Sequence, residues 1–306
     1  MDNIIHSLND YLDIIERFRA QFSQTHRNDD FIFRGMGNSS WPLLPGIFRE
    51  YSEPQKSSTV VGGSISGKIY SASEWEILAH FKKEACGFLP HILQSDDFTW
   101  LQYAQHYGVP TRLLDFTSNP LIAMYFCCQD ESADDGAIWI INEVNFDRWS
   151  TSEPFCTDLG PDYTREASIN SVFREMRGEF DHDALYGELH PRKQYPFVFI
   201  PAYIDQRMSA QSSRFMLWGY NHSALEDLAK DEHWMKLLPN GITFHVANDK
   251  RFISKVIVPA DCKHHIMKEL DLLNINEKGI FPGLDGLGRY INRYYKNNPD
   301  DICEFI

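Results

Sequence analysis

The chain has 306 residues, of which 43% are hydrophobic and 24% are charged, and its formal net charge is −14. This length and composition are typical of a globular protein with a substantial buried core. The acidic balance disfavours broad non-specific binding to nucleic acid, because the phosphate backbone would be repelled. No stretch approaches the roughly 18 apolar residues of a membrane span, so we expect a soluble, cytoplasmic protein without a membrane partner.

The first half of the chain is predicted to alternate helices with short strands. The Ser- and Gly-rich stretch 57–67 is expected to be a surface loop, and 111–118 a turn or short strand. Helices are predicted at 7–22, 73–93, 97–107 and 119–130, and strands at 31–33 and 136–141.

Strand signals are concentrated in the second half, after a poorly patterned excursion at 145–195. We therefore predict an α+β fold with a mixed, mostly antiparallel sheet flanked by helices. An N-terminal helix, 1–30, is expected to pack on one domain, 31–306. The strands are predicted at 197–204, 214–218, 242–247 and 252–258, and the helices at 223–237, at 260–273 and from Leu284 onward.

The first segment with chemical potential is Phe33-Arg34-Gly35, at the end of a predicted strand. An arginine there can present its planar guanidinium group to a phosphate or a carboxylate, and the glycine would let a ligand approach the backbone. The alternative is an arginine paired with a structural carboxylate.

The densest polar segment is 105–117, which carries a Gly-x-Pro turn and precedes the very apolar helix. Polar groups fixed between buried elements must pair with each other or with a ligand. Arg112 and Asp115 are three residues apart and could form a structural ion pair. The candidate ligand-binding or catalytic residues of the segment are Gln105, His106, Tyr107, Thr111, Arg112 and Asp115.

Two later segments are also candidates. Gln211 and the serines that follow it offer hydrogen bonds at the entrance to a strand, although capping of the strand edge is the favoured explanation. In the segment 279–287, Asp285 stands near the start of the last helix, where a capping role is the default. The six cysteines form no CxxC pair and no zinc-ligand spacing, so we expect reduced thiols and no metal.

Together these segments resemble the FRG-domain family. The resemblance runs in order from about residue 31 to 291 and departs from the family at Phe116, where a tryptophan is usual, and near Ser213, where a glycine commonly follows the glutamine. The similar segments are Phe33-Arg34-Gly35 with 42–45 and 48–49, 105–117 with 119–126, Arg207 with Gln211 and Phe215, and 281–287.

The family name does not itself supply an activity. By analogy at the level of the fold, its segments are similar to the split sheet of ADP-ribosyltransferases, which implies NAD as co-substrate. The expected enzyme is an ADP-ribosyltransferase or NAD glycohydrolase of a phage-defence or toxin system, acting on an unknown protein or nucleic-acid acceptor. The expected NAD-binding residues are Arg34 at the pyrophosphate, Tyr107 or Tyr125 at the nicotinamide, Gln105, His106 and Thr111 at the ribose, with Gly35 and Arg112 beside them.

Cleavage of the glycosidic bond also requires a group that stabilises an oxocarbenium-like state. The expected catalytic residues are Arg34, His106 and Gln211, and the stabilising acid remains open among Glu179, Glu188 and Asp285, with Gln211 as an amide substitute.

Two other functions remain open. One is a non-catalytic module that senses a small nucleotide or a phage component, which would be favoured if no acid lies near Arg34. The other is a metal-independent hydrolase or nuclease in which His106 and Asp115 form an acid–base pair.

Overall fold

The computed structural model is organised around a mixed sheet of seven strands. It describes residues 3–22, 31–49, 73–93, 95–130, 133–151, 169, 172–173, 176–177, 195–201, 203–219, 221–230, 235–237, 243–245 and 252–297.

The strands of this sheet are ordered β1-β9-β4-β2-β3-β6-β5, and all neighbours are antiparallel except β1 and β9. The predicted α+β class with a mostly antiparallel sheet is therefore confirmed. The seven strands are β1 (Asn3–Ile4), β2 (Phe31–Met36), β3 (Leu113–Thr117), β4 (Gly136–Asn142), β5 (Phe197–Phe199), β6 (Ser213–Leu217) and β9 (Ile253–Val258), and a separate hairpin pairs β7 (Met235–Leu237) with β8 (Thr243–His245).

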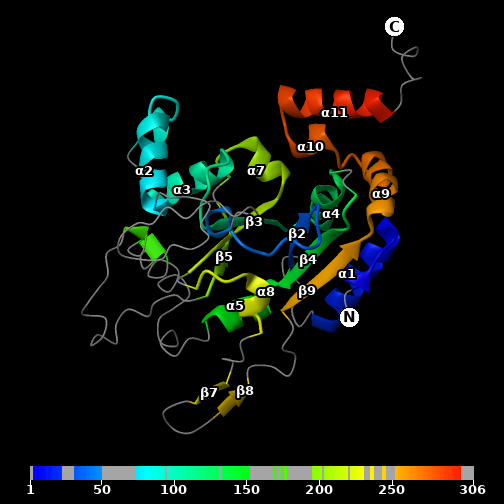
Figure 1. Cartoon of the computed structure of the whole chain (residues 1–306), viewed down its shortest axis with the longest axis horizontal. Coiled ribbons are helices and arrows are strands. Elements are labelled where there is room, and N and C mark those ends of the chain that lie inside the picture. The colour runs from blue at the N-terminus through cyan, green and yellow to red at the C-terminus, as the bar shows by residue number, and fades with distance from the viewer. Residues whose placement is uncertain are drawn as a thin grey trace, which may run out of the picture.

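Helices cover both faces of the sheet (Figure 1). On one face, α1, α4 and α9 bury an apolar cluster against β2, β4 and β9, while α2, α3 and α7 bury another against β3, β5 and β6. On the opposite face, α5 and α8 pack on the remaining side chains of the strands. The helices are α1 (Leu8–Phe22), α2 (Glu74–Ala85), α3 (Asp97–His106), α4 (Pro120–Cys128), α5 (Glu143–Thr151), α7 (Gln206–Ala210), α8 (Leu225–Leu228), α9 (Ala260–Leu272), α10 (Glu277–Ile280) and α11 (Leu284–Asn297).

Two predicted helices are shorter than expected. The helix predicted at 73–93 ends at Ala85, because Gly87 follows and Pro90 starts a separate 3-10 turn. The helix predicted at 223–237 is wrong: α8 spans only Leu225–Leu228, and 235–237 instead pairs with β8. The predicted loop at 57–67 and most of the excursion at 145–195 lie outside the described residues.

The sheet opens between β2 and β3. These strands share one pair in register, Phe33 with Thr117, whereas β2 pairs with β4 along its whole length. Beyond that pair the C-terminal half of β2 and the N-terminal half of β3 are not in register with each other. The helix group of α1, α4 and α9 covers β2 on one side of this opening, and the group of α2, α3 and α7 covers β3 on the other.

Gly35 brings α4 close to β2 beside this opening. A Cβ atom built on Gly35 would lie 1.7 Å from the backbone oxygen of Ala123 in α4, far inside van der Waals contact. Only glycine therefore permits this packing. The space left by the missing side chain of Gly35 is filled by α4, so the glycine serves helix packing here, and the expected approach of a ligand to its backbone stays a prediction.

Candidate functional site

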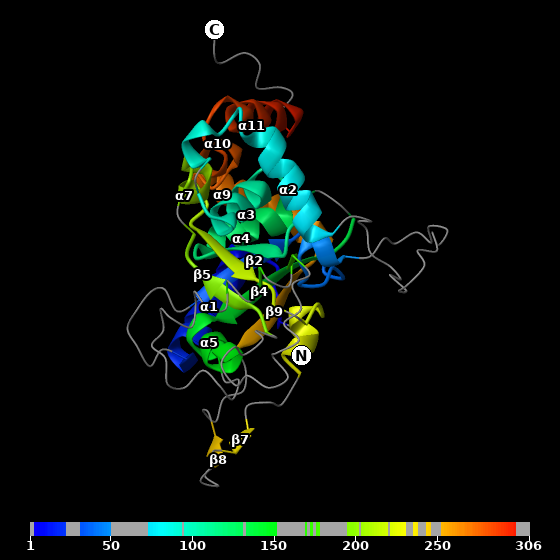
Figure 2. The same cartoon turned by 90° about the vertical axis from the view of Figure 1, so that its left-hand side faces the viewer.

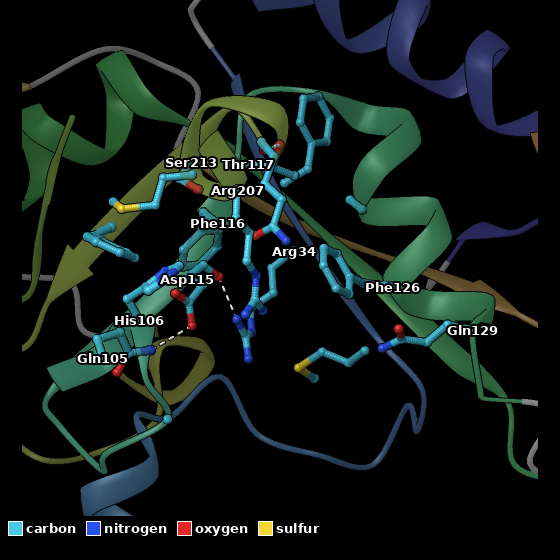
Figure 3. Close-up of a pocket in the computed structure, with 18 of the residues that line it drawn as sticks. Arg34, Gln105, His106, Asp115, Phe116, Thr117, Phe126, Gln129, Arg207 and Ser213 are labelled. Carbon is cyan, nitrogen blue, oxygen red and sulfur yellow. Dashed lines mark hydrogen bonds between the residues drawn. The ribbon is translucent and has the colours of Figure 1, made fainter. Parts of the chain in front are cut away.

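A pocket of about 640 Å³ lies where β2 and β3 diverge. Its walls come from β2 and β3, the C-terminal end of α3, one face of α4, and α7 with the start of β6 (Figure 3). The three sequence segments singled out above therefore meet in one place. The predicted residues in its lining are Arg34, Gly35, Gln105, His106, Tyr107, Asp115 and Gln211.

Arg34 spans the opening of the sheet. Its Nη1 donates a hydrogen bond of 2.5 Å to the backbone oxygen of Asp115, a carbonyl that β2 does not pair in register (Figure 3). Its Nε is buried and has no hydrogen-bond partner among the described residues. Burial lowers the pKa of Arg34 to about 10, and the nearby Asp115 opposes this shift. The guanidinium group is therefore charged at neutral pH and retains an unused donor.

The pocket is cationic in an acidic protein. In the part of the chain that the structure describes, its lining contains Arg34, Arg49 and Arg207 but only two acidic residues, Asp115 and Asp130. The chain as a whole carries a formal charge of −14. A local surplus of guanidinium groups favours anionic ligands, because planar guanidinium groups bind phosphate or carboxylate through paired hydrogen bonds.

The carboxylate of Asp115 is held from the side of α3. Nε2 of Gln105 donates to its Oδ2 at 2.6 Å, and Oγ1 of Thr111 donates to Oε1 of Gln105 at 2.6 Å. Thr111 itself is buried and does not line the pocket. It therefore orients Gln105, and the expectation that it contacts a ribose directly is corrected.

His106 is paired with a residue that sequence analysis did not select. Its Nε2 lies 2.5 Å from Oδ2 of Asp205, the residue that caps the N-terminus of α7. Burial lowers the pKa of His106, and Asp205 opposes the shift. At neutral pH the imidazole is therefore uncharged and able to accept a proton. Any acid–base pair built on His106 would involve Asp205, because Asp115 is engaged by Gln105.

Gln211 joins the pocket to two neighbouring elements. Its backbone oxygen accepts a hydrogen bond of 2.7 Å from Oγ1 of Thr117, and its Nε2 donates to the backbone oxygen of Ile280 at 3.3 Å. The next residue, Ser212, has φ +48°. This left-handed conformation favours glycine, which agrees with the glycine expected after the glutamine in the FRG-domain family.

Aromatic side chains complete the lining. Tyr107 is 62% exposed at the rim, and Trp41 is half exposed. Phe126 lines the pocket from α4, where Ala123 shares its helical face, and Asp130 lines it just after the helix ends. Flat aromatic surfaces beside cationic groups suit a ligand that combines planar rings with phosphates.

Arg112 does not belong to this pocket. It lies on the other face of β3 from Asp115, since residues three apart in an extended chain point to opposite sides. Its Nε donates to Oε2 of Glu74 at 2.7 Å, and its Nη1 donates to the backbone oxygen of Trp218 at 3.3 Å. Both the ligand contact and the Arg112–Asp115 ion pair expected from the sequence are thus corrected.

Tyr125 and Asp285 also lie away from the lining. Tyr125 is buried in the core formed by α4, and burial raises the pKa of its hydroxyl above its usual value. A stacking role on a ligand is therefore corrected to a packing role. Asp285 stands in the first turn of α11, and the capping role expected from the sequence stays a prediction. Glu179 and Glu188 lie outside the described residues.

Several groups of the site are not among the residues predicted from the sequence, namely Asp205, Arg49, Asp130 and Phe126. Asp205 carried a usable signal, because an aspartate before a short helical stretch is a favoured N-cap. Phe126 was identified as apolar core, and its exposure to a pocket follows only from which face of α4 meets β2.

Within the described residues, no three His, Cys, Asp or Glu side chains are grouped as a metal would require. In the same part of the chain, no helix is both long and apolar enough to cross a bilayer. Residues 29–136 match the family model of the FRG domain. No similarity to a curated protein or to a solved structure is found. The matched region contributes β2, α3, β3 and α4 to the pocket, while Arg207 and Gln211 come from beyond it.

Proposed function

We propose that this chain, which contains an FRG domain, binds NAD in the pocket between β2 and β3 and breaks its nicotinamide–ribose bond. The observation that supports this most directly is the juxtaposition of a charged arginine with a buried, unpartnered Nε and a carboxylate in a cationic pocket. The pyrophosphate of NAD carries two negative charges, which Arg34 and its neighbours Arg49 and Arg207 can neutralise.

The carboxylate of Asp115 supplies the second requirement. When the glycosidic bond breaks, its electron pair leaves with nicotinamide and an oxocarbenium-like ribose remains, which a fixed negative charge stabilises. Asp115 is held by Gln105, and in the described part of the pocket lining the only acids are Asp115 and Asp130. We therefore assign the stabilising role to Asp115 in place of a late glutamate.

His106 has the properties of a base for the second half of the reaction. The ribose cation is captured by water or by an acceptor nucleophile, and the nucleophile must lose a proton. Because burial lowers the pKa of His106, the imidazole is uncharged at neutral pH and can take that proton, while Asp205 stabilises the resulting cation. Capture by water gives a glycohydrolase, and capture by a macromolecule gives a transferase.

A sensor without chemistry is the second candidate. It is favoured by the hydrogen bond that Gln105 donates to the Asp115 carboxylate, because this bond weakens the ability of the carboxylate to stabilise an oxocarbenium-like ribose. Against it stands the position of the acid: Asp115 is close enough to Arg34 to influence its pKa, whereas a pure anion receptor gains nothing from a carboxylate in its wall.

The test is incubation of the purified protein with NAD, following nicotinamide release, protein labelling and thermal protection. Asp115→Asn should abolish nicotinamide release while preserving protection by NAD, and Arg34→Gln, which keeps a donor but removes the charge, should lose both. Lys230→Ala, which removes an ion pair exposed at the surface, is the matched control for a lost charge. Thermal protection by NAD without nicotinamide release in the wild-type protein would favour the sensor. The absence of both protection and release would overturn the NAD proposal.

A further inference from the structure

The segment 279–287, which follows α9, contacts residues of the pocket without lining the pocket itself. In this segment the sequence predicts only a structural role for Asp285, and none of its described residues lines the pocket. In the structure α10, at the start of this segment, contacts α7, the helix that carries Arg207 (Figure 2). A part of the chain outside the pocket thus lies behind one of its walls.

Two contacts connect this segment to pocket residues. Cζ of Arg207 lies over the ring of Phe281, 4.9 Å from its centroid. The backbone oxygen of Ile280 accepts the hydrogen bond from Nε2 of Gln211 at 3.3 Å. Arg207 is exposed as a residue, so its long side chain would otherwise sample many rotamers. A guanidinium group over an aromatic face is held by the ring quadrupole as well as by contact.

Phe281 is itself held firmly. Its backbone N–H donates to the oxygen of Glu277 at 2.8 Å, and its ring meets that of Phe126, which lines the pocket, at a centroid distance of 6.2 Å. Gly286 allows α11 to start directly against it, since a Cβ there would lie 1.9 Å from the backbone oxygen of Phe281. The ring is therefore a fixed platform.

An ion-pair clamp fixes the platform to the rest of the fold. Nε of Arg293 in α11 pairs with Glu277 at 2.6 Å, and its Nη1 pairs with Asp271 of α9 at 2.7 Å. These bonds join α9, α10 and α11. The backbone on both sides of Phe281, in α10 and α11, is therefore anchored to α9.

We propose that Phe281 is a positioning residue that orients the Arg207 guanidinium toward an anionic group of the ligand. The inference rests on the proposed function in one respect, namely that Arg207 contacts the ligand's phosphates. It gives the segment 279–287 a role in binding in addition to packing. It also makes the aromatic ring, and not merely an apolar side chain, the required feature at this position.

The affinity test uses ADP, which carries a diphosphate without a nicotinamide bond to break. Phe281→Leu should weaken ADP binding roughly two- to five-fold, the factor to which an exposed cation–π contact corresponds. Phe281→Tyr, which keeps the ring, should bind as the wild type does. Adding Phe281→Leu to Arg207→Ala should cause no further loss, because the contact is already absent.

Tyr290→Leu is the matched structural control. It removes a similar contact, that of Lys278 with the Tyr290 ring at 4.5 Å, from the same α10–α11 unit but outside the pocket lining. Equal weakening of ADP binding by Tyr290→Leu and Phe281→Leu would overturn the proposal, since both would then act through the stability of the unit. Independent effects of Phe281→Leu and Arg207→Ala would overturn it as well.

A second measurement is independent of any ligand. The Nε proton of Arg207 should be shielded by the ring current of Phe281, and its NMR signal, assigned with Arg207→Lys, should move downfield in Phe281→Leu but not in Tyr290→Leu. An unmoved signal would refute the positioning role. If the wild-type protein bound neither ADP nor NAD, the proposed function would fail, and the Arg207 signal would still decide whether Phe281 orients it.

Discussion

Replacement of Arg112 by methionine should reveal whether this arginine of the densest polar segment serves stability or binding. The side chains of Arg112 and Glu74 are only 3% and 7% exposed, and their atoms Nε and Oε2 are 2.7 Å apart. Arg112→Met preserves much of the apolar volume but leaves the Glu74 carboxylate buried with its charge uncompensated. We therefore expect a large loss of stability with ligand binding retained in the folded protein.

The magnitude follows from the geometry. Removing one residue of a buried ion pair lowers the free energy of unfolding by about 3–5 kcal/mol, because the remaining charge is buried without a partner. For a chain of this size each kcal/mol lowers the melting temperature by about 2–4 °C, so the expected decrease is roughly 6–20 °C. The hydrogen bond from the backbone N–H of Arg112 to Glu74, at 2.9 Å, remains in the variant and places the loss toward the lower end.

The assay is thermal and urea unfolding of the single variants and of the double variant Glu74→Gln/Arg112→Met. Because the neutral amide needs no counter-charge, the double variant should recover part of the stability lost in Arg112→Met. The exposed pair Lys230–Asp227 is the control, and Lys230→Ala should change stability by less than about 1 kcal/mol. An unchanged melting temperature in Arg112→Met together with lost NAD or ADP binding would refute the structural assignment.

Three further predictions follow from the site. Gly35→Ala should destabilise the protein by about 3 kcal/mol or more, or prevent folding, because its Cβ would meet the backbone of α4; wild-type stability would contradict the packing role assigned to Gly35. Ser212→Gly should raise the unfolding free energy by up to about 1 kcal/mol in urea titrations, since the left-handed strain at φ +48° exceeds the entropic cost of glycine; a clear loss would show that the serine side chain matters more. Because the pKa of His106 is lowered in the folded protein, the unfolded chain binds a proton at this residue first as the pH falls, so its contribution to stability is present above the ordinary imidazole pKa of about 6.5 and is lost progressively below it. His106→Gln should therefore flatten the pH dependence of the unfolding free energy between the folded-state pKa and about 6.5. An identical slope in the variant and the wild type would contradict the shift.

The sequence by itself determined most elements and the residues of the site that lie in marked local patterns. Hydrophobic periodicity predicted α1, α3 and α9 and the strands β4, β6 and β9 closely, because these elements bury regular faces. The strand predicted at 31–33 continues to Met36, so Arg34 lies within β2 and not at its end. Arg34 and Asp115 stood out because strong polar groups occurred beside buried segments. The alternation of a strand would also have excluded the pair Arg112–Asp115, had 111–118 been taken as extended.

Only the tertiary structure decided which partners these groups have. Glu74 lies 38 residues before Arg112, and Asp205 lies about a hundred residues after His106, so no local spacing could predict either pair. In α4, Phe126 faces the pocket and the adjacent Tyr125 faces the core. Because the helix is apolar on all sides, its sequence alone does not predict which side chain faces which. The pocket itself arises because β2 and β3 separate after one pair, and that separation depends on long-range strand pairing and helix packing, which no local pattern encodes.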